Sequence, residues 1–129
     1  MAYGGEPELR ILPGPHGDYF DAAAGPRFLS TAWRVSPVSD RRGLRLEGEP
    51  LEHAREAEVP PQGTVAGTIQ VPGDGRPIVL GPDGPVTGGY PQIATVIEAD
   101  LPLLGQAVPG DVLRFRIVTR QAAEAARRE

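Results

Sequence analysis

Residues 67–80 read Gly-Thr-Ile-Gln-Val-Pro-Gly-Asp-Gly-Arg-Pro-Ile-Val-Leu, and this stretch decides the fold of the chain. A run rich in β-branched residues, 64–71, precedes the turn sequence, and a second apolar run, 77–80, follows it. Asp74-Gly75 lies between the two runs, and glycine tolerates the positive φ angle that a tight turn needs. The stretch therefore predicts two antiparallel strands joined as a hairpin.

Further short strands are predicted on both sides of this hairpin. Residues 42–48 and 112–118 alternate apolar and charged side chains, which is the pattern of a strand with one wet face. Residues 8–12 also alternate, and 28–38 and 93–97 are strand-like apolar runs. We expect a mainly β protein whose sheet closes into a barrel, because closure removes exposed strand edges.

Only one or two short helices are expected, because 17 glycines and 15 prolines interrupt the chain along its whole length. Residues 18–24 can form one or two helical turns, closed by Gly25-Pro26. Residues 99–107 can form another, with Asp100 as the N-cap.

A length of 129 residues suits one domain. We expect residues 1–8 to be a flexible N-terminus and 9–119 to be the folded domain. Residues 120–129 have helical propensity but no evident apolar stripe, so we expect a polar tail that frays. Residues 51–62 are polar and indicate a surface loop.

Composition excludes several kinds of site. The chain has no cysteine, which excludes a disulfide, a thiolate zinc site and a cysteine nucleophile. All 13 basic residues are arginine, so no lysine in the chain can form a Schiff base, complete a P-loop or accept biotin. A net charge of −4 with scattered arginines argues against nucleic acid. No run approaches about 18 apolar residues and no leader is visible, so we expect a cytoplasmic protein without a membrane span.

The glycine-rich loop 81–90 is the first candidate site. Its glycines, Gly88 and Gly89 among them, let backbone N–H groups approach an anion or an acyl oxygen closely. Asp83 can act as a catalytic base, Thr87 can donate a hydrogen bond, and Tyr90 can contact substrate. The alternative is a turn that only connects two barrel strands, with Tyr90 as a packing residue.

Arg41 and Gln70 are the other candidates. Arg41 can bind a substrate carboxylate with two hydrogen bonds, with Asp40 orienting it, or it can be a solvated turn residue. Gln70 can recognise an amide if it faces the mouth of the barrel, or it can be an ordinary outward position. His16 and His53 are far apart in sequence, so we predict no metal site.

Several segments together resemble one known family, named after allophanate hydrolase subunit 2 and the C subunit of 5-oxoprolinase, which includes kinase-inhibitor antagonists of the KipA type. The resemblance covers residues 9–118 and only the C-terminal half of a typical member. Gly84-Pro85 departs from the family, which often has a charged or amide-bearing pair there. The matching segments are 9–15 with Asp18-Tyr19-Phe20, 39–48, 67–72 with Asp74-Gly75, 77–80, 87–91, 99–102 and 109–115.

The resemblance implies a cyclophilin-like β-barrel and a part of an enzyme that hydrolyses C–N bonds. It implies ATP-dependent opening of a small cyclic amide, 5-oxoproline to glutamate, with a partner related to allophanate hydrolase subunit 1 or to the B subunit of 5-oxoprolinase (KipI-like). Because the chain has no P-loop and no lysine, arginines, backbone amides, the missing N-terminal half or the partner would hold ATP. The isolated chain is therefore expected to be inactive.

Two alternatives remain open. One is a non-catalytic module that binds a partner and regulates it, which the altered Gly84-Pro85 pair favours. The other is a carboxyltransferase segment of a biotin-dependent urea carboxylase, in which the biotin is attached to a different part of the protein.

Overall fold

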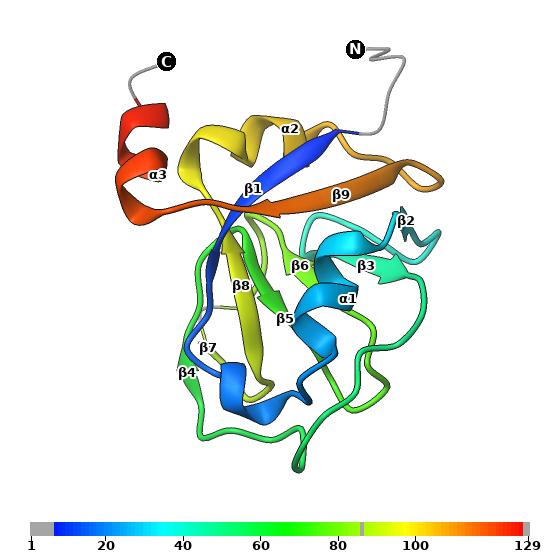
Figure 1. Cartoon of the computed structure of the whole chain (residues 1–129). Helices are drawn as coiled ribbons and strands as arrows, with labels where there is room; N and C mark the ends of the chain where they lie inside the picture. Colours follow the sequence, from blue (N-terminus) through cyan, green and yellow to red (C-terminus); the bar gives the residue numbers. More distant parts are fainter. Residues whose placement is uncertain (1–6, 86, 128–129) are drawn as a thin grey trace.

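The computed structural model describes residues 7–85 and 87–127, and within them seven strands close into a barrel (Figure 1). Neighbouring strands follow the order β1-β8-β5-β6-β3-β2-β9. Parallel pairing of β1 with β9 closes the ring, and every other neighbouring pair is antiparallel. The expectation of a mainly β closed barrel is confirmed. The strands are β1 (Glu8–Pro13), β2 (Trp33–Val35), β3 (Gly43–Glu47), β5 (Thr68–Gln70), β6 (Ile78–Leu80), β8 (Gln92–Val96) and β9 (Val112–Ile117).

The predicted hairpin is present as β5 and β6. Ile69 pairs with Val79, and the two strands are antiparallel. Gly75 has a φ of 79° and donates its N–H to the Pro72 carbonyl at 2.9 Å. A Cβ at Gly75 would lie 2.5 Å from the Leu51 carbonyl oxygen, so the turn needs glycine for close approach as well as for conformation.

The barrel interior holds a mostly aliphatic core with one aromatic cluster. Phe28 stacks on Phe115 with ring centroids 4.7 Å apart, and the buried Trp33 donates its indole N–H to the Phe28 carbonyl at 3.1 Å. The hydrogen bond satisfies the indole N–H, which would otherwise be buried without a partner. Core positions alternate along the strands, as in Leu9 and Ile11 of β1.

The first helix lies later in the chain than the sequence suggested. A 3-10 turn, η1, covers Gly17–Tyr19, and the helix α1 covers Ala24–Ser30. Gly25-Pro26 therefore opens a helix, whereas we expected it to close one. Proline fits in the first turn because the first N–H groups of a helix have no carbonyl partner within it. As a result, only Trp33–Val35 of the run 28–38 forms a strand.

The second helical region was located correctly, but Asp100 does not cap it. The 3-10 turn η2 (Glu98–Asp100) leads into α2 (Leu101–Gly105), and the Asp100 side chain makes no cap hydrogen bond. Its carboxylate instead accepts from Arg10: from the backbone N–H at 2.7 Å, from Nε at 3.0 Å and from Nη2 at 2.7 Å. The contact fastens β1 to the start of α2.

The C-terminal segment forms a helix that packs on the barrel, where we expected a polar tail that frays. The helix α3 covers Arg120–Ala126, and the Thr119 hydroxyl accepts from the N–H of Ala122 at 3.0 Å as its N-cap. Ala123 and Ala126 are buried against Ile97 and its neighbours. The apolar stripe exists but consists of alanines, which also occur on exposed faces. Residues 1–6 and 128–129, where flexibility was also expected, lie outside the described residues, and Glu8 belongs to β1.

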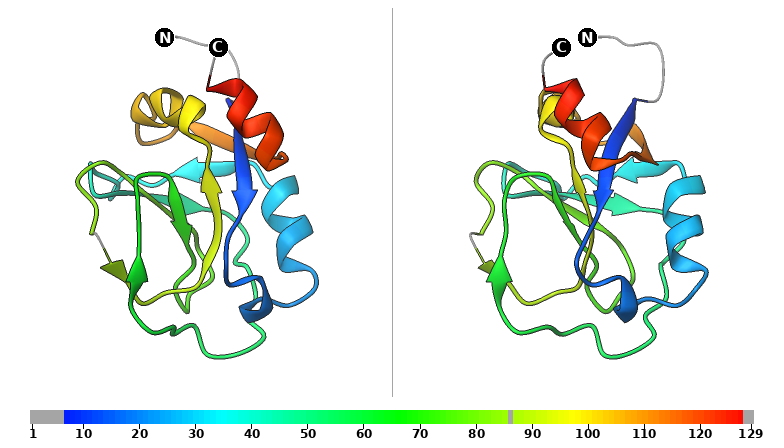
Figure 2. Two further views of the ribbon diagram at one scale, coloured as in Figure 1. Left: turned by 90° about the vertical axis from the view of Figure 1, so that its left-hand side faces the viewer. Right: turned by 60° about the vertical axis from the view of Figure 1, so that its left-hand side comes forward.

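Two long loops meet in a small separate sheet. Strand β4 (Gln62–Gly63) pairs with β7 (Thr87–Gly88), and the two lie side by side toward the end of the molecule opposite α2 and α3 (Figures 1 and 2). The N–H of Val59 donates to the Gly89 carbonyl at 2.9 Å. The expected surface loop 51–62 is largely irregular, but Leu51 and Val59 are buried. None of the helices in the described part of the chain is long and apolar enough to span a bilayer.

Candidate functional site

Arg41 and Asp83 form an ion pair although they are 42 residues apart in sequence. The Arg41 Nε donates to Asp83 Oδ2 at 2.7 Å, and the Asp83 N–H donates to the Arg41 carbonyl at 3.2 Å. Both side chains are exposed, by 74% and 56%. Gly81 makes this approach possible, since a Cβ there would lie 2.2 Å from the Arg41 carbonyl oxygen. The structure thus joins two residues that we had predicted in separate segments.

Asp40 does not orient Arg41, which corrects that part of the prediction. Its Oδ2 pairs with Arg42 Nη2 at 3.1 Å, and its Oδ1 accepts from the Arg42 N–H at 2.8 Å. These hydrogen bonds, the one from the Arg42 side chain above all, lower the pKa of Asp40 below its ordinary value. The residue that orients Arg41 is Asp83, and Arg42 keeps Asp40 in a local turn.

A cavity of about 410 Å³ opens beside the Arg41–Asp83 pair, between β3, β6 and α2. Arg41 and Asp40 lie at its polar part, and Ser39 and Gly81 also line it. The rest of the lining is apolar. The sequence does not indicate this cavity, because apolar residues also form ordinary protein cores. The apolar residues that line it are Leu44, Ala66, Val79, Leu80, Pro82, Leu101, Leu104, Ala107 and Pro109.

Gln70 lies elsewhere, under the β4–β7 sheet. It is only 4% exposed, and its side-chain Nε2 has no hydrogen-bond partner among the residues that the structure describes. Gly88 covers this amide so closely that a Cβ there would lie 2.0 Å from Nε2. Its cross-strand neighbour Gln92 donates its own Nε2 to the Gly63 carbonyl at 3.4 Å. Two glutamine amides of the barrel wall therefore contact the small sheet.

The predicted site residues thus fall into two groups. Gln70 pairs with Ile78 at the beginning of β6, whereas Gly81 and Asp83 follow the end of that strand. Gly88 lies against Gln70, Thr87 belongs to the same strand β7, and Gly89 and Tyr90 follow that strand. None of these four residues lines the cavity. Their assignment as substrate-binding residues stays a prediction, as do those of Arg41 and Asp83.

The two histidines serve the scaffold. His16 Nδ1 accepts from the Gln92 N–H at 3.0 Å, and His53 Nε2 lies 2.9 Å from the Val71 carbonyl oxygen. The described residues contain no group of three or more histidine, aspartate or glutamate side chains that could hold a metal ion.

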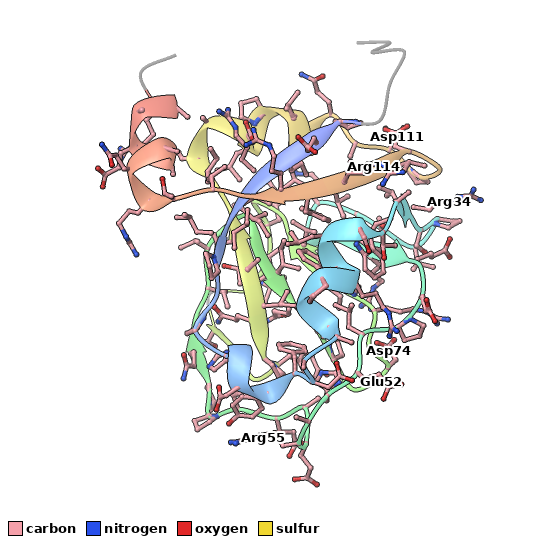
Figure 3. The ribbon with its side chains drawn as sticks, viewed as in Figure 1. Arg34, Glu52, Arg55, Asp74, Asp111 and Arg114 are labelled. Atoms are coloured by element: carbon pink, nitrogen blue, oxygen red, sulfur yellow. The ribbon has the colours of Figure 1, made fainter. Side chains whose placement is uncertain are left out.

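Charged side chains of both signs lie at both ends of the barrel. Figure 3 shows Arg34, Arg114 and Asp111 around β2 and β9, and Arg55, Glu52 and Asp74 toward the opposite end. Arg55 lies over the Tyr19 ring, 4.8 Å from its centroid, and 3.7 Å from Asp18.

Three comparisons place the chain among known proteins. It is 40% identical over 121 residues to the C subunit of 5-oxoprolinase from Escherichia coli, which covers 94% of this chain and 39% of that protein. It is 37% identical over 118 residues to urea amidolyase of Saccharomyces cerevisiae, covering 83% of this chain and 6% of that protein. The crystal structure of the K. lactis urea amidolyase superimposes with a TM-score of 0.87 at 30% identity, over 92% of this chain and 8% of that one.

The chain therefore spans about two fifths of the bacterial relative and a small part of the fungal ones. The model of the family described as carboxyltransferase domain, subdomain A and B, matches residues 1–117, which is most of the chain. That range includes every strand of the barrel, as well as Arg41, Gln70 and Asp83. On this match and these relatives, the chain belongs to the carboxyltransferase domain, subdomain A and B, family.

Proposed function

We propose that this chain is part of an enzyme subunit that hydrolyses a C–N bond of a small cyclic amide in an ATP-dependent reaction. The 40% identity to a 5-oxoprolinase subunit over nearly the whole chain supports the reaction class. The observation that carries the proposal is Arg41, paired with Asp83, in the lining of a mostly apolar cavity, because a charged group beside an apolar pocket suits a small organic acid. The substrate that fits both is 5-oxoproline.

The rest of the subunit and a partner complete this proposed enzyme. ATP, when bound, would supply the phosphoryl group that activates the lactam oxygen for attack by water. The chain contains no lysine and no P-loop, so we place the nucleotide on a segment corresponding to the part of the bacterial relative that this chain does not cover, or on a KipI-like partner related to the B subunit of 5-oxoprolinase. We place the complex in the cytoplasm and propose that the isolated chain is inactive.

The test is ATP hydrolysis by the chain joined to its N-terminal half and mixed with its partner subunits, with and without 5-oxoproline. We expect ATP turnover that depends on 5-oxoproline, and glutamate as product. A stable complex without turnover would instead support a regulatory module, for which the Gly84-Pro85 pair is the motivating feature. Turnover of 5-oxoproline by the chain alone would contradict the proposal that it needs partners.

A second candidate is the carboxyltransferase segment of a biotin-dependent urea carboxylase. The observation in its favour is structural: the Kluyveromyces lactis urea carboxylase superimposes with a TM-score of 0.87 over 92% of this chain. The two candidates differ in their requirements, since the carboxylase reaction would need bicarbonate and a biotin attached to another chain or domain. Activity that depends on bicarbonate and is abolished by avidin would favour this second candidate.

A further inference from the structure

We propose that the cavity between β3, β6 and α2 binds a small carboxylic acid with an apolar body, and that the free edge of Arg41 takes the carboxylate. This inference rests on the proposed function only in that the acid would be the substrate or product of that reaction. The cavity holds about 410 Å³, within the range of small-molecule sites. Its apolar walls favour a hydrocarbon ring or chain over a sugar or polyol.

The geometry of Arg41 carries the inference. A guanidinium presents five N–H donors along two usable edges. Asp83 accepts from Nε alone, and no second contact of the Arg41 side chain occurs within residues 7–85 and 87–127. The Nη1–Nη2 edge therefore remains available for a carboxylate that approaches with two parallel hydrogen bonds.

Asp83 has a positioning role in this arrangement. It contacts Arg41 twice, by its carboxylate at Nε and by its own N–H at the Arg41 carbonyl. The backbone contact fixes the two loops against each other, and the carboxylate restrains the guanidinium, so less side-chain freedom is lost when a ligand binds. Asp83 is paired with Arg41 Nε and does not line the cavity, so we assign it to orientation and not to base catalysis.

The charge balance at the cavity permits an anion. Asp40, the carboxylate that lines the cavity, is hydrogen-bonded through both oxygens to Arg42. With Asp83 paired to Arg41, the two acids and two arginines sum to zero, so an incoming carboxylate meets no uncompensated negative charge among these four residues. The alternative occupant of the cavity is an apolar side chain of a partner protein. Such a side chain would contact the apolar walls but would make no hydrogen bond to the Nη edge of Arg41, so a small acid fits the cavity better.

The test is a titration of the 129-residue chain followed by amide chemical shifts, with three probes of similar size. The probes are 5-oxoproline, cyclopentanecarboxylate, which lacks the lactam, and 2-pyrrolidinone, which lacks the carboxylate. We expect both acids to shift the amide resonances of Leu80, Gly81 and Leu104. We expect 2-pyrrolidinone to bind at least about tenfold more weakly than the acids, because it cannot form the charge-assisted hydrogen bonds to Arg41. Equal binding of all three probes, or no binding of either acid, overturns the inference.

Two variants sharpen this titration. R41Q should reduce the affinity for both acids to that for 2-pyrrolidinone. R45Q removes the same charge from an exposed β3 residue outside the cavity lining, and it should leave all three affinities unchanged. If R45Q weakened acid binding as much as R41Q, the effect would be general electrostatics and the assignment to Arg41 would be wrong.

Asp83→Asn separates positioning from base catalysis in the assembled enzyme. For a positioning residue, KM should rise severalfold while kcat stays the same. A collapse of kcat at unchanged KM would make Asp83 the base and refute its assignment here. The experiments distinguish failure of this inference from failure of the proposed function. If acids bind in this cavity but the assembled enzyme shows no turnover, only the proposed function is contradicted. If the enzyme turns over but no acid binds in this cavity, only the inference is contradicted.

Discussion

The side-chain amide of Gln70 lies directly against the α-carbon of Gly88, so closely that a Cβ at Gly88 would lie 2.0 Å from Gln70 Nε2. Gly88→Ala should therefore push β7 away from the barrel or force the buried amide into a poorer rotamer. Because the clashing atom is the end of a side chain, which can turn aside only within a buried site, we expect a loss of about 1 kcal/mol in the free energy of unfolding, measured by urea denaturation.

The neighbouring glycine provides the control for this substitution. A Cβ at Gly89 would meet nothing nearer than the Val59 carbonyl oxygen at 3.5 Å, which is an ordinary contact. Gly89→Ala should therefore change stability far less than Gly88→Ala. If both variants lost the same amount, the contact with Gln70 would not be the cause.

Gln70 itself should be replaceable without loss of stability. Its Nε2 is buried and lacks a partner within the described part of the chain, and such a group costs about 1–3 kcal/mol. Gln70→Met keeps a similar length and removes the polar amide, so unfolding free energy should stay equal or rise. Gln92→Met is the matched control, because it removes the hydrogen bond to Gly63 and should be destabilising.

The same variant tests the predicted role of Gln70 in amide recognition. An activity lost in a Gln70→Met enzyme of normal or raised stability would indicate that the amide is retained for function. Full activity of Gln70→Met in the assembled complex would contradict that role, and Gln70 would then be only a buried residue under the small sheet.

The hairpin and the alternating strands could be predicted from sequence because each depends on local chemistry. Asp74-Gly75 specifies its turn, and the alternation in 43–47 directly reflects one buried and one exposed face. The Arg41–Asp83 pair could not be predicted, because the barrel joins residues from two separate loops. Asp100 illustrates the same limit: its sequence position suits a cap, but β1 offers Arg10 as a stronger partner.

Gly81→Ala should damage the loop that carries Asp83. The clash would be with backbone, since a Cβ would lie 2.2 Å from the Arg41 carbonyl oxygen, and backbone cannot move aside as a side-chain end can. We expect a loss of about 1–3 kcal/mol by urea denaturation together with weaker binding of acids. Gly25→Ala, in helix α1 with open space around it, should instead be neutral or stabilising by up to about 1 kcal/mol.

Asp100 should make the protein sensitive to acid. Burial by itself would raise the pKa of this carboxyl, but the hydrogen bonds from the Arg10 side chain and N–H outweigh burial and hold the pKa below its ordinary value. Since the folded-state pKa is lower than the unfolded one, the stabilisation is present above about pH 4. It is lost as pH falls through the folded-state pKa.

The check is the pH dependence of the urea midpoint between about pH 6 and pH 2.5. Asp100→Asn should lower stability at pH 6, because Arg10 loses a buried ionic partner, and should flatten the acid limb. Asp18→Asn removes an exposed acid that lies 3.7 Å from Arg55 and should change little. An unchanged acid limb in Asp100→Asn would show that other carboxyls determine the acid sensitivity.

Helix α3 presents two adjacent alanines in opposite environments, which allows a test of whether it packs on the barrel. Ala126 is buried against Ile97 and its neighbours, whereas Ala125 is exposed. Ala126→Glu should release the helix, because burying an unpaired carboxylate costs more than the few contacts of α3 can offset. Ala125→Glu adds the same charge at the surface and should leave the helix in place.

Since the release is local, amide hydrogen exchange over residues 120–126 is the right measurement, with the barrel strands as the internal reference. Fast exchange there in the unsubstituted protein would mean that the alanine stripe does not hold α3 and that this segment is, after all, a frayed tail.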